Sequence, residues 1–389
     1  MDPSSFTDNA PGKLIKSSGG RWAFVPNPLP PKLQYTPETL QLLSWADQKL
    51  GELAGVGKML PNPHMLIGPF LRHEAVLSSR IEGTLATEEE LLLFEINPAV
   101  EAKTPDVREV ANYVKAIEYG FKRLKKLPVC LRFIRELHER LLHGVRGADR
   151  RPGEFRTVQN YIGTRGEPIQ NARFVPPPPS ELGPVLDQLE QFLNAPSGLP
   201  LLIELALTHY QFEAIHPFVD GNGRIGRLLL SILLCERGPL PKPLLYLSAY
   251  FEKNRTQYVD LLLEVSKSGA WQEWIQFFLK GVAIQSEDAI ARSQELLALW
   301  QKYRSRMQTV RASALGLNLI DSLFSRPVLT IPMAADRLKV TYASAKLNVE
   351  KLVKNGILFE VTGNRRNRTY IAQEIMNIIS SRRETRIAN

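Results

Sequence analysis

Cysteine is scarce in this 389-residue chain, and long apolar runs are missing from it. The two cysteines, Cys130 and Cys235, lie far apart and show no Cys/His spacing, which argues against a disulfide framework and against a zinc site. The most apolar stretch, 228–235, is much too short to cross a bilayer. The first residues lack a basic segment followed by an apolar one, so no secretory signal is predicted. We therefore expect a cytoplasmic protein without a membrane partner.

An excess of one charge is also missing from the first 300 residues. After position 300 the chain holds 16 of its 49 basic and 6 of its 40 acidic residues, so this segment carries +10 and the rest carries −1. The net charge of +9 therefore resides in the last part of the chain. This pattern indicates a separate module with an anionic partner, and a solvated helical surface is the alternative.

Helical periodicity dominates from Thr36 onward and predicts a mainly α fold. The Pro/Gly/Ser-rich segment Met1–Gln34 predicts an extended arm with little regular structure. Thr36 can cap a helix that has Pro37 at its first position. The predicted domains are an N-terminal arm with a helical segment (1–100), a central helical domain (101–270), a connecting helix (271–310) and a C-terminal domain (311–389).

Two segments depart from the helical pattern. Residues Thr157–Gly163 alternate in the β manner and are followed by turn residues and by Ala172–Val175, which predicts a β-hairpin inside the helical domain. The tail shows helix, helix and hairpin, which is typical of a small α+β winged helix-turn-helix. Its predicted helices span 331–338 and 344–355, and its predicted strands span 356–361 and 368–371.

The segment His216–Arg227 lies between two apolar helical stretches and carries the candidate chemistry. Pro217 ends the first helix and leaves His216 at its edge. His216 titrates near neutral pH and is a natural general base. The glycines on either side of Asn222 allow positive φ, so that backbone N–H groups form an anion-binding nest where the next helix begins.

Three charged side chains complete this pattern. Arg224 and Arg227 are three residues apart, share a helix face and can both reach a phosphate chain. Asp220 places a carboxylate beside the nest, which is useful when a divalent cation neutralises it. These residues together are the parts of a site for nucleotide-phosphate transfer.

Gly221, Gly223 and Gly226 also match the spacing of a dinucleotide-binding fingerprint. That fingerprint needs a hydrophobic strand before it, whereas 201–215 has helical periodicity, and no acidic residue follows at the expected position. The pair Gly57-Lys58 does not indicate a phosphate-binding loop, because the other residues of that motif are missing around it. A glycine-rich turn between two helices without a ligand is the remaining alternative.

Every fixed position of the segment matches the signature His-Pro-Phe-x-Asp-Gly-Asn-Gly-Arg-x-x-Arg, and the chain resembles the Fic family over most of Tyr35–Ser266. The resemblance implies a helical bundle with a β-hairpin flap, here followed by the winged helix. It implies transfer of AMP from ATP to a Ser, Thr or Tyr hydroxyl, with His216 as the base and Asp220 as the ligand of Mg²⁺. The residues that it assigns to the ATP phosphates are Gly221, Asn222, Gly223, Arg224, Ile225, Gly226 and Arg227, the last of which reaches the γ-phosphate.

The resemblance also implies roles outside the signature. Ile162 and Gly163 would align the target chain by β-augmentation. Asn254 would lie at the adenine and ribose, and capping of a helix that begins at Arg255 is the alternative role of its side chain. Ser78-x-x-x-Glu82-Gly resembles the inhibitory motif of the family. In that case Glu82 pairs with Arg227 and keeps it from the γ-phosphate.

Other functions remain open at this stage. The same fold could transfer another group, such as UMP, phosphate or phosphocholine, or could remove AMP. A DNA-binding regulator with a nucleotide-sensing site is an alternative from another class, and a protein-docking role for the tail is a further one. The target protein, self-modification and a homodimer are not decided by any motif. The residues that would contact DNA are Tyr342, Ser344, Lys346, Asn348, Arg365, Arg366 and Arg368.

Overall fold

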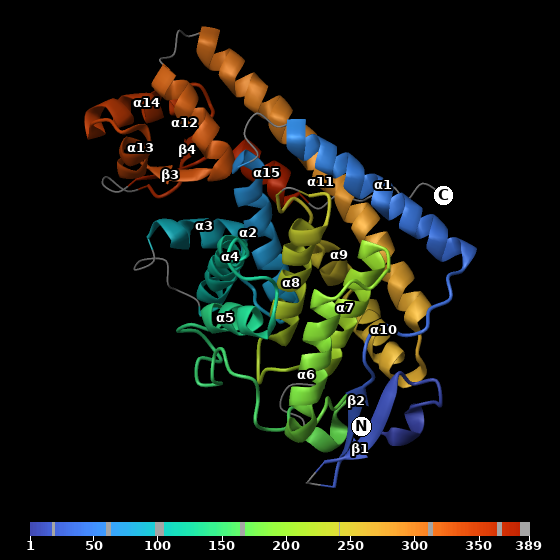
Figure 1. Ribbon diagram of the computed structural model, residues 1–389. Coiled ribbons are helices and arrows are strands. Elements are labelled where there is room, and N and C mark those ends of the chain that lie inside the picture. The colour runs from blue at the N-terminus through green and yellow to red at the C-terminus, as the bar shows by residue number, and fades with distance from the viewer. Residues whose placement is uncertain are drawn as a thin grey trace.

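Two long helices, α1 (Pro37–Met59) and α11 (Trp271–Thr309), run side by side along one edge of the molecule (Figure 1). The computed structural model describes residues 1–17, 20–59, 64–97, 105–163, 168–240, 242–309, 314–363 and 368–381. Thr36 caps α1 as predicted, since its hydroxyl accepts a hydrogen bond from the Thr39 N–H at 3.3 Å. The predicted connecting helix is α11.

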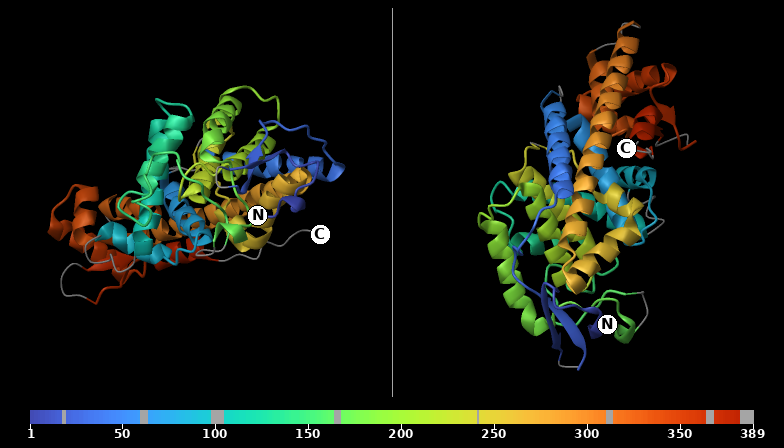
Figure 2. Two further views of the ribbon diagram at one scale, coloured as in Figure 1. Left: turned by 90° about the horizontal axis from the view of Figure 1, so that it is seen from below. Right: turned by 90° about the vertical axis from the view of Figure 1, so that its right-hand side faces the viewer.

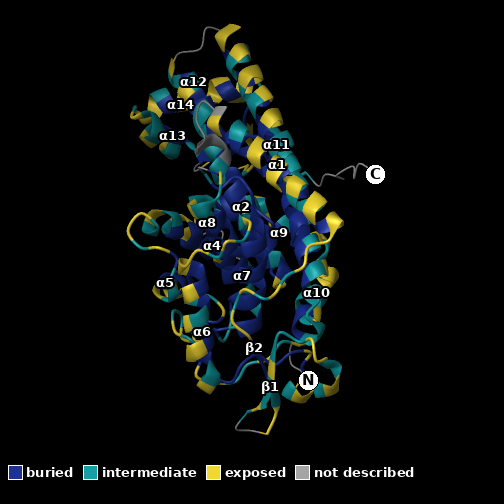
Figure 3. Ribbon diagram, turned by 45° about the vertical axis from the view of Figure 1, so that its right-hand side comes forward, coloured by how far each residue is buried: buried dark blue, intermediate teal, exposed yellow. Residues whose placement is uncertain are grey.

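The core is centred on α7 (Leu201–Ile215), which is buried on nearly all sides (Figure 3). Its residues are mostly apolar, as expected of a helix enclosed by other helices, although Glu204, His209 and Gln211 are also buried. It packs against α6, α8, α10 and α11. None of the helices in the described ranges is both long and apolar enough to span a membrane. Other helices of this region are α2 (His64–Ile81), α3 (Glu88–Ile96), α4 (Pro105–Arg123), α5 (Leu131–Leu141), α6 (Pro179–Asn194), α8 (Asn222–Arg237), α9 (Ser248–Lys253) and α10 (Arg255–Ser268), with single 3-10 turns at Pro3–Ser5 and Ile169–Asn171.

The N-terminal arm is more regular than its composition predicts. Strands β1 (Gly12–Lys16) and β2 (Trp22–Pro26) form an antiparallel hairpin, so the expectation of little regular structure is wrong. Short apolar runs on both sides of a Gly/Ser-rich sequence supply the strands, and the side chain of Phe24 is fully buried. The Phe24 N–H also donates to the Val175 carbonyl at 2.9 Å, which ties the arm to the segment in front of α6.

The hairpin predicted at 157–175 is reduced to one bridge. Ile162 and Phe174 exchange two backbone hydrogen bonds, of 2.8 and 3.1 Å, and form an isolated antiparallel pair without flanking strands. The run of prolines at 176–179 has no N–H groups to donate, so a ladder cannot continue beyond Val175. Residues 164–167 of the connecting turn lie outside the described residues.

The C-terminal part lies at the end of the molecule opposite the β1–β2 hairpin (Figures 1 and 2). Its sheet has the order β3-β5-β4, in which β5 pairs antiparallel with both neighbours. The helices and strands predicted here are present, and α12, β3 and α15 are additions. Helix α15 turns back and packs on α11 and α2. The elements are α12 (Ala314–Ser325), β3 (Val328–Thr330), α13 (Ile331–Leu338), α14 (Tyr342–Lys354), β4 (Phe359–Glu360), β5 (Thr369–Ile371) and α15 (Gln373–Ser380).

Candidate active site

The loop between α7 and α8 is held in an unusual backbone conformation. His216 ends α7 with a φ of 50°, and Gly221 precedes α8 with a φ of 80°. Asn222 locks the loop, because its side chain accepts from the Phe218 N–H at 2.8 Å and donates to the Phe218 carbonyl at 2.9 Å. The Asn222 side chain therefore shapes the nest, and the backbone N–H groups at the start of α8 are left to bind an anion.

Residues from distant segments support this loop. Arg156 is buried and donates to the carbonyls of His216 at 2.9 Å and of Pro177 at 2.6 Å. His138 stacks on Phe218 with ring centroids 3.7 Å apart. Burial lowers the pKa of His138 to about 4, so this ring is neutral. Its Nδ1 accepts from the Gly153 N–H at 2.9 Å, which leaves Nε2 to donate to the Asp220 carbonyl at 2.9 Å.

His216 is placed as a base. Its ring is half-buried and lines a cavity, and burial lowers its pKa to about 4. The Nδ1 atom lies 3.3 Å from the Glu213 carbonyl, where it can only act as a donor. In the neutral ring Nε2 then carries the lone pair and is able to accept a proton at neutral pH.

Arg224 and Asp220 lie close together, but their surroundings differ. Arg224 is 2% exposed and donates to Glu109, itself 1% exposed, at 3.0 Å. The side chain of Asp220 is 43% exposed, and its Oδ1 accepts from the Gly221 N–H at 2.6 Å and lies 3.7 Å from Arg224 Nη2. Arg224 thus has a buried carboxylate partner that its position in the motif does not predict.

Arg227 is bound by the turn at the end of α2. Its Nε donates to Ser78 Oγ and its Nη2 to the Ser78 carbonyl, both at 2.9 Å, and Nη2 also donates to Glu82 Oε1 at 2.7 Å. Burial favours the neutral form of Glu82, yet Arg227 outweighs it and lowers the pKa of this carboxyl. Glu82 is therefore ionised at neutral pH, and the contact is a charge-assisted pair.

A cavity of about 560 Å³ lies beside His216 and Arg227. Glu82, His216, Gly223 and Arg227 form its polar side, and Ile162 and Gly163 border it from the flap. Its opposite wall is α10, a surface that the sequence analysis missed although an apolar stripe with i, i+4 spacing marks it. The α10 residues that line the cavity are Arg255, Thr256, Tyr258, Val259, Leu262, Leu263 and Ser266.

Of the eight residues predicted to bind ATP, all of them described, only Gly223 and Arg227 line this cavity, and three of the others have contacts that were not expected. Asn254 stands at the start of α10, where its side chain donates to the Tyr250 carbonyl at 2.9 Å and does not line the cavity. Nor does it cap α10 through its side chain. Ile225 is fully buried in the core, and Gly226 faces the carboxyl group of Glu213. Glu213 lines the cavity and was missed by the sequence analysis.

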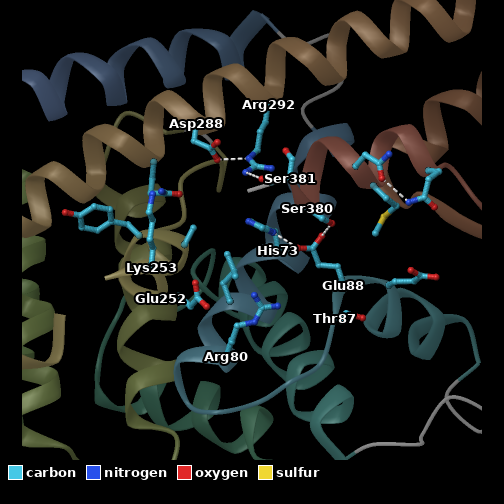
Figure 4. Close-up of a pocket in the computed structure, with 18 of the residues that line it drawn as sticks. His73, Arg80, Thr87, Glu88, Glu252, Lys253, Asp288, Arg292, Ser380 and Ser381 are labelled. Carbon is cyan, nitrogen blue, oxygen red and sulfur yellow. Dashed lines mark hydrogen bonds and ion pairs between the residues drawn. The ribbon is translucent and has the colours of Figure 1, made fainter. Parts of the chain in front are cut away.

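A second and larger cavity, of about 1030 Å³, lies on the other side of α2 between α3, α9, α11 and α15 (Figure 4). Glu88 of α3 connects two walls of this cavity. It accepts a hydrogen bond from the Ser380 hydroxyl of α15 at 2.6 Å, and it contacts His73 of α2. Arg292 donates to Asp288 at 2.6 Å and to the Ser381 carbonyl at 2.7 Å. The residues of the signature do not line this cavity, so its greater size does not make it the candidate active site.

The fold and the site define a helical protein with an anion-binding nest at the start of α8. Residues 40–122 match the Fic/DOC family N-terminal region and residues 128–234 match the Fic/DOC family. The segment that matches the Fic/DOC family contains the loop between α7 and α8.

Curated relatives bear the name protein adenylyltransferase Fic. The protein of Drosophila grimshawi is 32% identical over 204 residues, which are 51% of this chain and 38% of that protein. The protein of Drosophila virilis is 36% identical over 166 residues, 41% of this chain and 32% of its own length. The chain thus spans about a third of the curated relatives that it matches.

Solved structures share the fold. A Fic family protein from Desulfovibrio desulfuricans superposes with a TM-score of 0.57 at 17% identity, covering 88% of this chain and 98% of that one. A Fic domain containing signaling protein from Bacteroides thetaiotaomicron superposes with a TM-score of 0.51 at 22% identity, covering 66% of this chain and 97% of that one.

Proposed function

We propose that this chain transfers AMP from ATP to a Ser, Thr or Tyr hydroxyl of a target protein. The observation that carries the proposal is a neutral His216, which opens onto a cavity that also holds the start of α8 and Arg227. The name of the curated relatives supports the nature of the transferred group. Transfer of another group by the same site remains the enzymatic alternative.

The proposed reaction is a displacement at the α-phosphorus. His216 Nε2 takes the proton of the target hydroxyl, and the oxygen forms a bond to the α-phosphorus of ATP. The bond to the β-phosphate oxygen breaks, and pyrophosphate leaves with the electron pair. The backbone N–H groups of Asn222 and Gly223 in the nest hold phosphate oxygens, and Arg227 holds the γ-phosphate once it is free of Glu82.

Asp220 fits a magnesium ligand. Its carboxylate is 43% exposed and lies beside the nest. The described residues contain no cluster of three or more His, Cys, Asp or Glu able to hold a metal. A single carboxylate is nevertheless sufficient, because Mg²⁺ is usually held by one or two carboxylates together with substrate phosphates. The ion supplies charge neutralisation of the phosphate chain when it is bound.

The walls of the cavity suggest where the two substrates lie. The apolar surface of α10, with Val259, Leu262 and Leu263, suits the base of the nucleotide. The backbone at Ile162 and Gly163 suits an extended target segment, and only one cross-strand pair occupies this edge in the described residues.

Glu82 is proposed to inhibit the reaction. Its carboxylate and the γ-phosphate compete for the same guanidinium group of Arg227, and both are negatively charged. ATP would then bind without the correct placement of its phosphates. Ser78 holds Arg227 on the same side and completes the inhibitory contact.

The C-terminal part is proposed to be a winged helix-turn-helix, on the basis of its element order and its three-stranded sheet. On α14, Tyr342 is 57% exposed and Lys346 is exposed, as a DNA-reading helix requires, but Asn348 is buried. Arg365 and Arg366 lie outside the described residues. Exposed Leu347 and other apolar side chains nearby favour a protein partner at this face over DNA.

We keep the predicted domain division as a proposal. Residues 101–270 are the catalytic unit, and the N-terminal segment regulates it. A homodimer and self-modification are compatible with it. The cytoplasm is the proposed compartment because both cysteines are free.

Incubation with α-labelled ATP, Mg²⁺ and a cell extract tests the proposal. The Glu82→Gly protein should label one or more protein bands, and the Glu82→Gly/His216→Ala protein should label none. Label from γ-labelled ATP would instead identify phosphate transfer. Salt-dependent binding of a DNA duplex, without labelling of protein, would favour the regulator.

A further inference from the structure

Glu213 is a half-buried acid beside the phosphate-binding part of the cavity. It stands in the last turn of α7, three residues before His216, and lines the cavity with Arg227 and Gly223. Its Oε1 atom is shielded from solvent and has no hydrogen-bond partner within the described part of the chain. A carboxyl group of this kind is costly to bury unless a ligand or partner satisfies it.

Two glycines on one face of α8 make room for two carboxyl groups. A Cβ atom at Gly223 would lie 2.3 Å from Glu82 Oε1, and a Cβ atom at Gly226 would lie 2.3 Å from Glu213 Oε1. Since these glycines are three residues apart, Glu82 and Glu213 rest on successive turns of the same helix face. The second carboxyl group therefore lies next to the place that Glu82 occupies on Arg227.

The two carboxyl groups differ in charge. Burial, together with the negative charge of Glu82, raises the pKa of Glu213 to about 8, although Arg227 opposes the shift. Glu82 is held ionised by its bond to Arg227. At neutral pH the pair thus consists of one carboxylate and one carboxylic acid, which is able to donate a hydrogen bond. The other ionisable groups that line the cavity are Arg173, Tyr210, His216, Arg255 and Tyr258.

We propose that Glu213 binds the nucleotide as an uncharged acid and donates its proton in a hydrogen bond to a phosphate oxygen beside Arg227. This inference rests on the proposed function, since the phosphate chain takes the place that Glu82 vacates. Arg227 supplies charge to the phosphate, and Glu213 supplies a donor without adding a negative charge. An ionised Glu213 would repel the same phosphate.

This arrangement gives nucleotide binding a defined dependence on pH. Below pH 8 the acid is protonated and donates, and as the pH rises through about 8 it ionises and the donor is lost. The terminal phosphate loses its last proton at a pKa of about 6, so the ligand itself does not weaken with rising pH in this range. Affinity for ATP should consequently fall between pH 7 and pH 9.

Equilibrium binding of ATP with Mg²⁺, measured by calorimetry between pH 6.5 and 9, tests the proposal. Glu82→Gly serves as the parent, so that competition by Glu82 does not mask the effect; burial, which is the largest cause of the raised pKa of Glu213, remains in this protein. Two variants of this parent are compared, Glu213→Gln, whose amide donates at every pH, and Glu213→Leu, which has no donor. Glu52→Gln, at an exposed position on α1, is the matched control for loss of a carboxylate.

The parent and the control should bind about tenfold more weakly at pH 9 than at pH 7, in line with the loss of a hydrogen bond to a charged group. The Gln variant should bind within about threefold of the parent at pH 7 and show no such decline. The Leu variant should bind about tenfold more weakly at pH 7 and be equally flat.

Binding by the parent that stays constant to pH 9, or a Gln variant that keeps the decline, would overturn the proposal. Should the Leu variant not fold, the pH profiles of the parent and the Gln variant alone decide the matter. Nucleotide binding that follows the expected profile without any labelling of protein would refute the proposed transfer and leave the role of Glu213 intact.

Discussion

Replacement of Glu82 by glycine should raise the rate of AMP transfer, because it frees Arg227. The bond to be removed is 2.7 Å long and joins a guanidinium group that is 3% exposed to a carboxylate that is 38% exposed. A hydrogen bond with a charged group contributes about 1.5–3 kcal/mol, and the partial exposure of Glu82 places this one near the lower limit. A value of about 1.5 kcal/mol corresponds to about tenfold in the equilibrium between blocked and free Arg227.

Initial rates with α-labelled ATP below saturation measure this effect. Glu82→Gly should be about tenfold faster than the unchanged chain. Glu82→Gln should lie between the two, since it keeps an acceptor oxygen and loses the charge. Glu52→Gln should match the unchanged chain. Equal rates for the unchanged chain and Glu82→Gly, with equal nucleotide binding, would refute competition for Arg227.

The stability of the Glu82 variants provides an independent check. Arg227 stays buried in them and keeps its two bonds to Ser78. Loss of its carboxylate partner should lower the free energy of unfolding by about 1–3 kcal/mol. A melting temperature that falls while the transfer rate rises is therefore expected, and it would show that the contact stabilises the fold at the expense of activity.

Three further predictions concern neighbouring groups. In the Glu82→Gly protein, the acid limb of kcat/KM should lie near pH 4, because burial lowers the pKa of His216 to about 4 and the neutral ring is the active base above that value; an acid limb near pH 6.5 would contradict this. Asp220→Asn should raise the Mg²⁺ concentration needed for half-maximal transfer by about tenfold, measured by titration of the metal, whereas a general loss of rate at saturating Mg²⁺ would indicate another role. Glu109→Ala should lower the free energy of unfolding in urea by about 3–5 kcal/mol, because it leaves the charge of Arg224 buried without that carboxylate partner; a loss below about 1 kcal/mol would show that the site admits water.

The sequence predicts those parts of the site that are local in the chain. Pro217 and Gly221 set the turn between α7 and α8 from their own backbone preferences, and the pairing of Glu82 with Arg227 follows from two recognisable motifs. The structure brings Arg224 to Glu109, 115 residues away, and such a partner leaves no periodic mark in the sequence. Asn254 was expected at the nucleotide, and its side chain donates to the Tyr250 carbonyl of α9.

The fold was predictable to a similar degree. Long helices and the cap of α1 follow from local signals, whereas the cap of α14 was not predicted: Thr341 accepts from the Ser344 N–H at 3.4 Å, and the helix begins at Tyr342. Two predictions of local structure differ from the observed fold. The hairpin expected at 157–175 is a single bridge, and the N-terminal arm, expected to have little regular structure, contains a hairpin. Both depend on tertiary contacts, since Phe24 and Phe174 pack together with ring centroids 5.8 Å apart.

Helix α2 is a wall shared by two cavities. Ile81 and Glu82 at its end border the cavity of His216, and His73 and Arg80 face the larger cavity under α15 (Figure 4). The two volumes are therefore not independent quantities. A shift of α2 that widens the cavity beside Arg227 narrows the larger cavity beneath the C-terminal part.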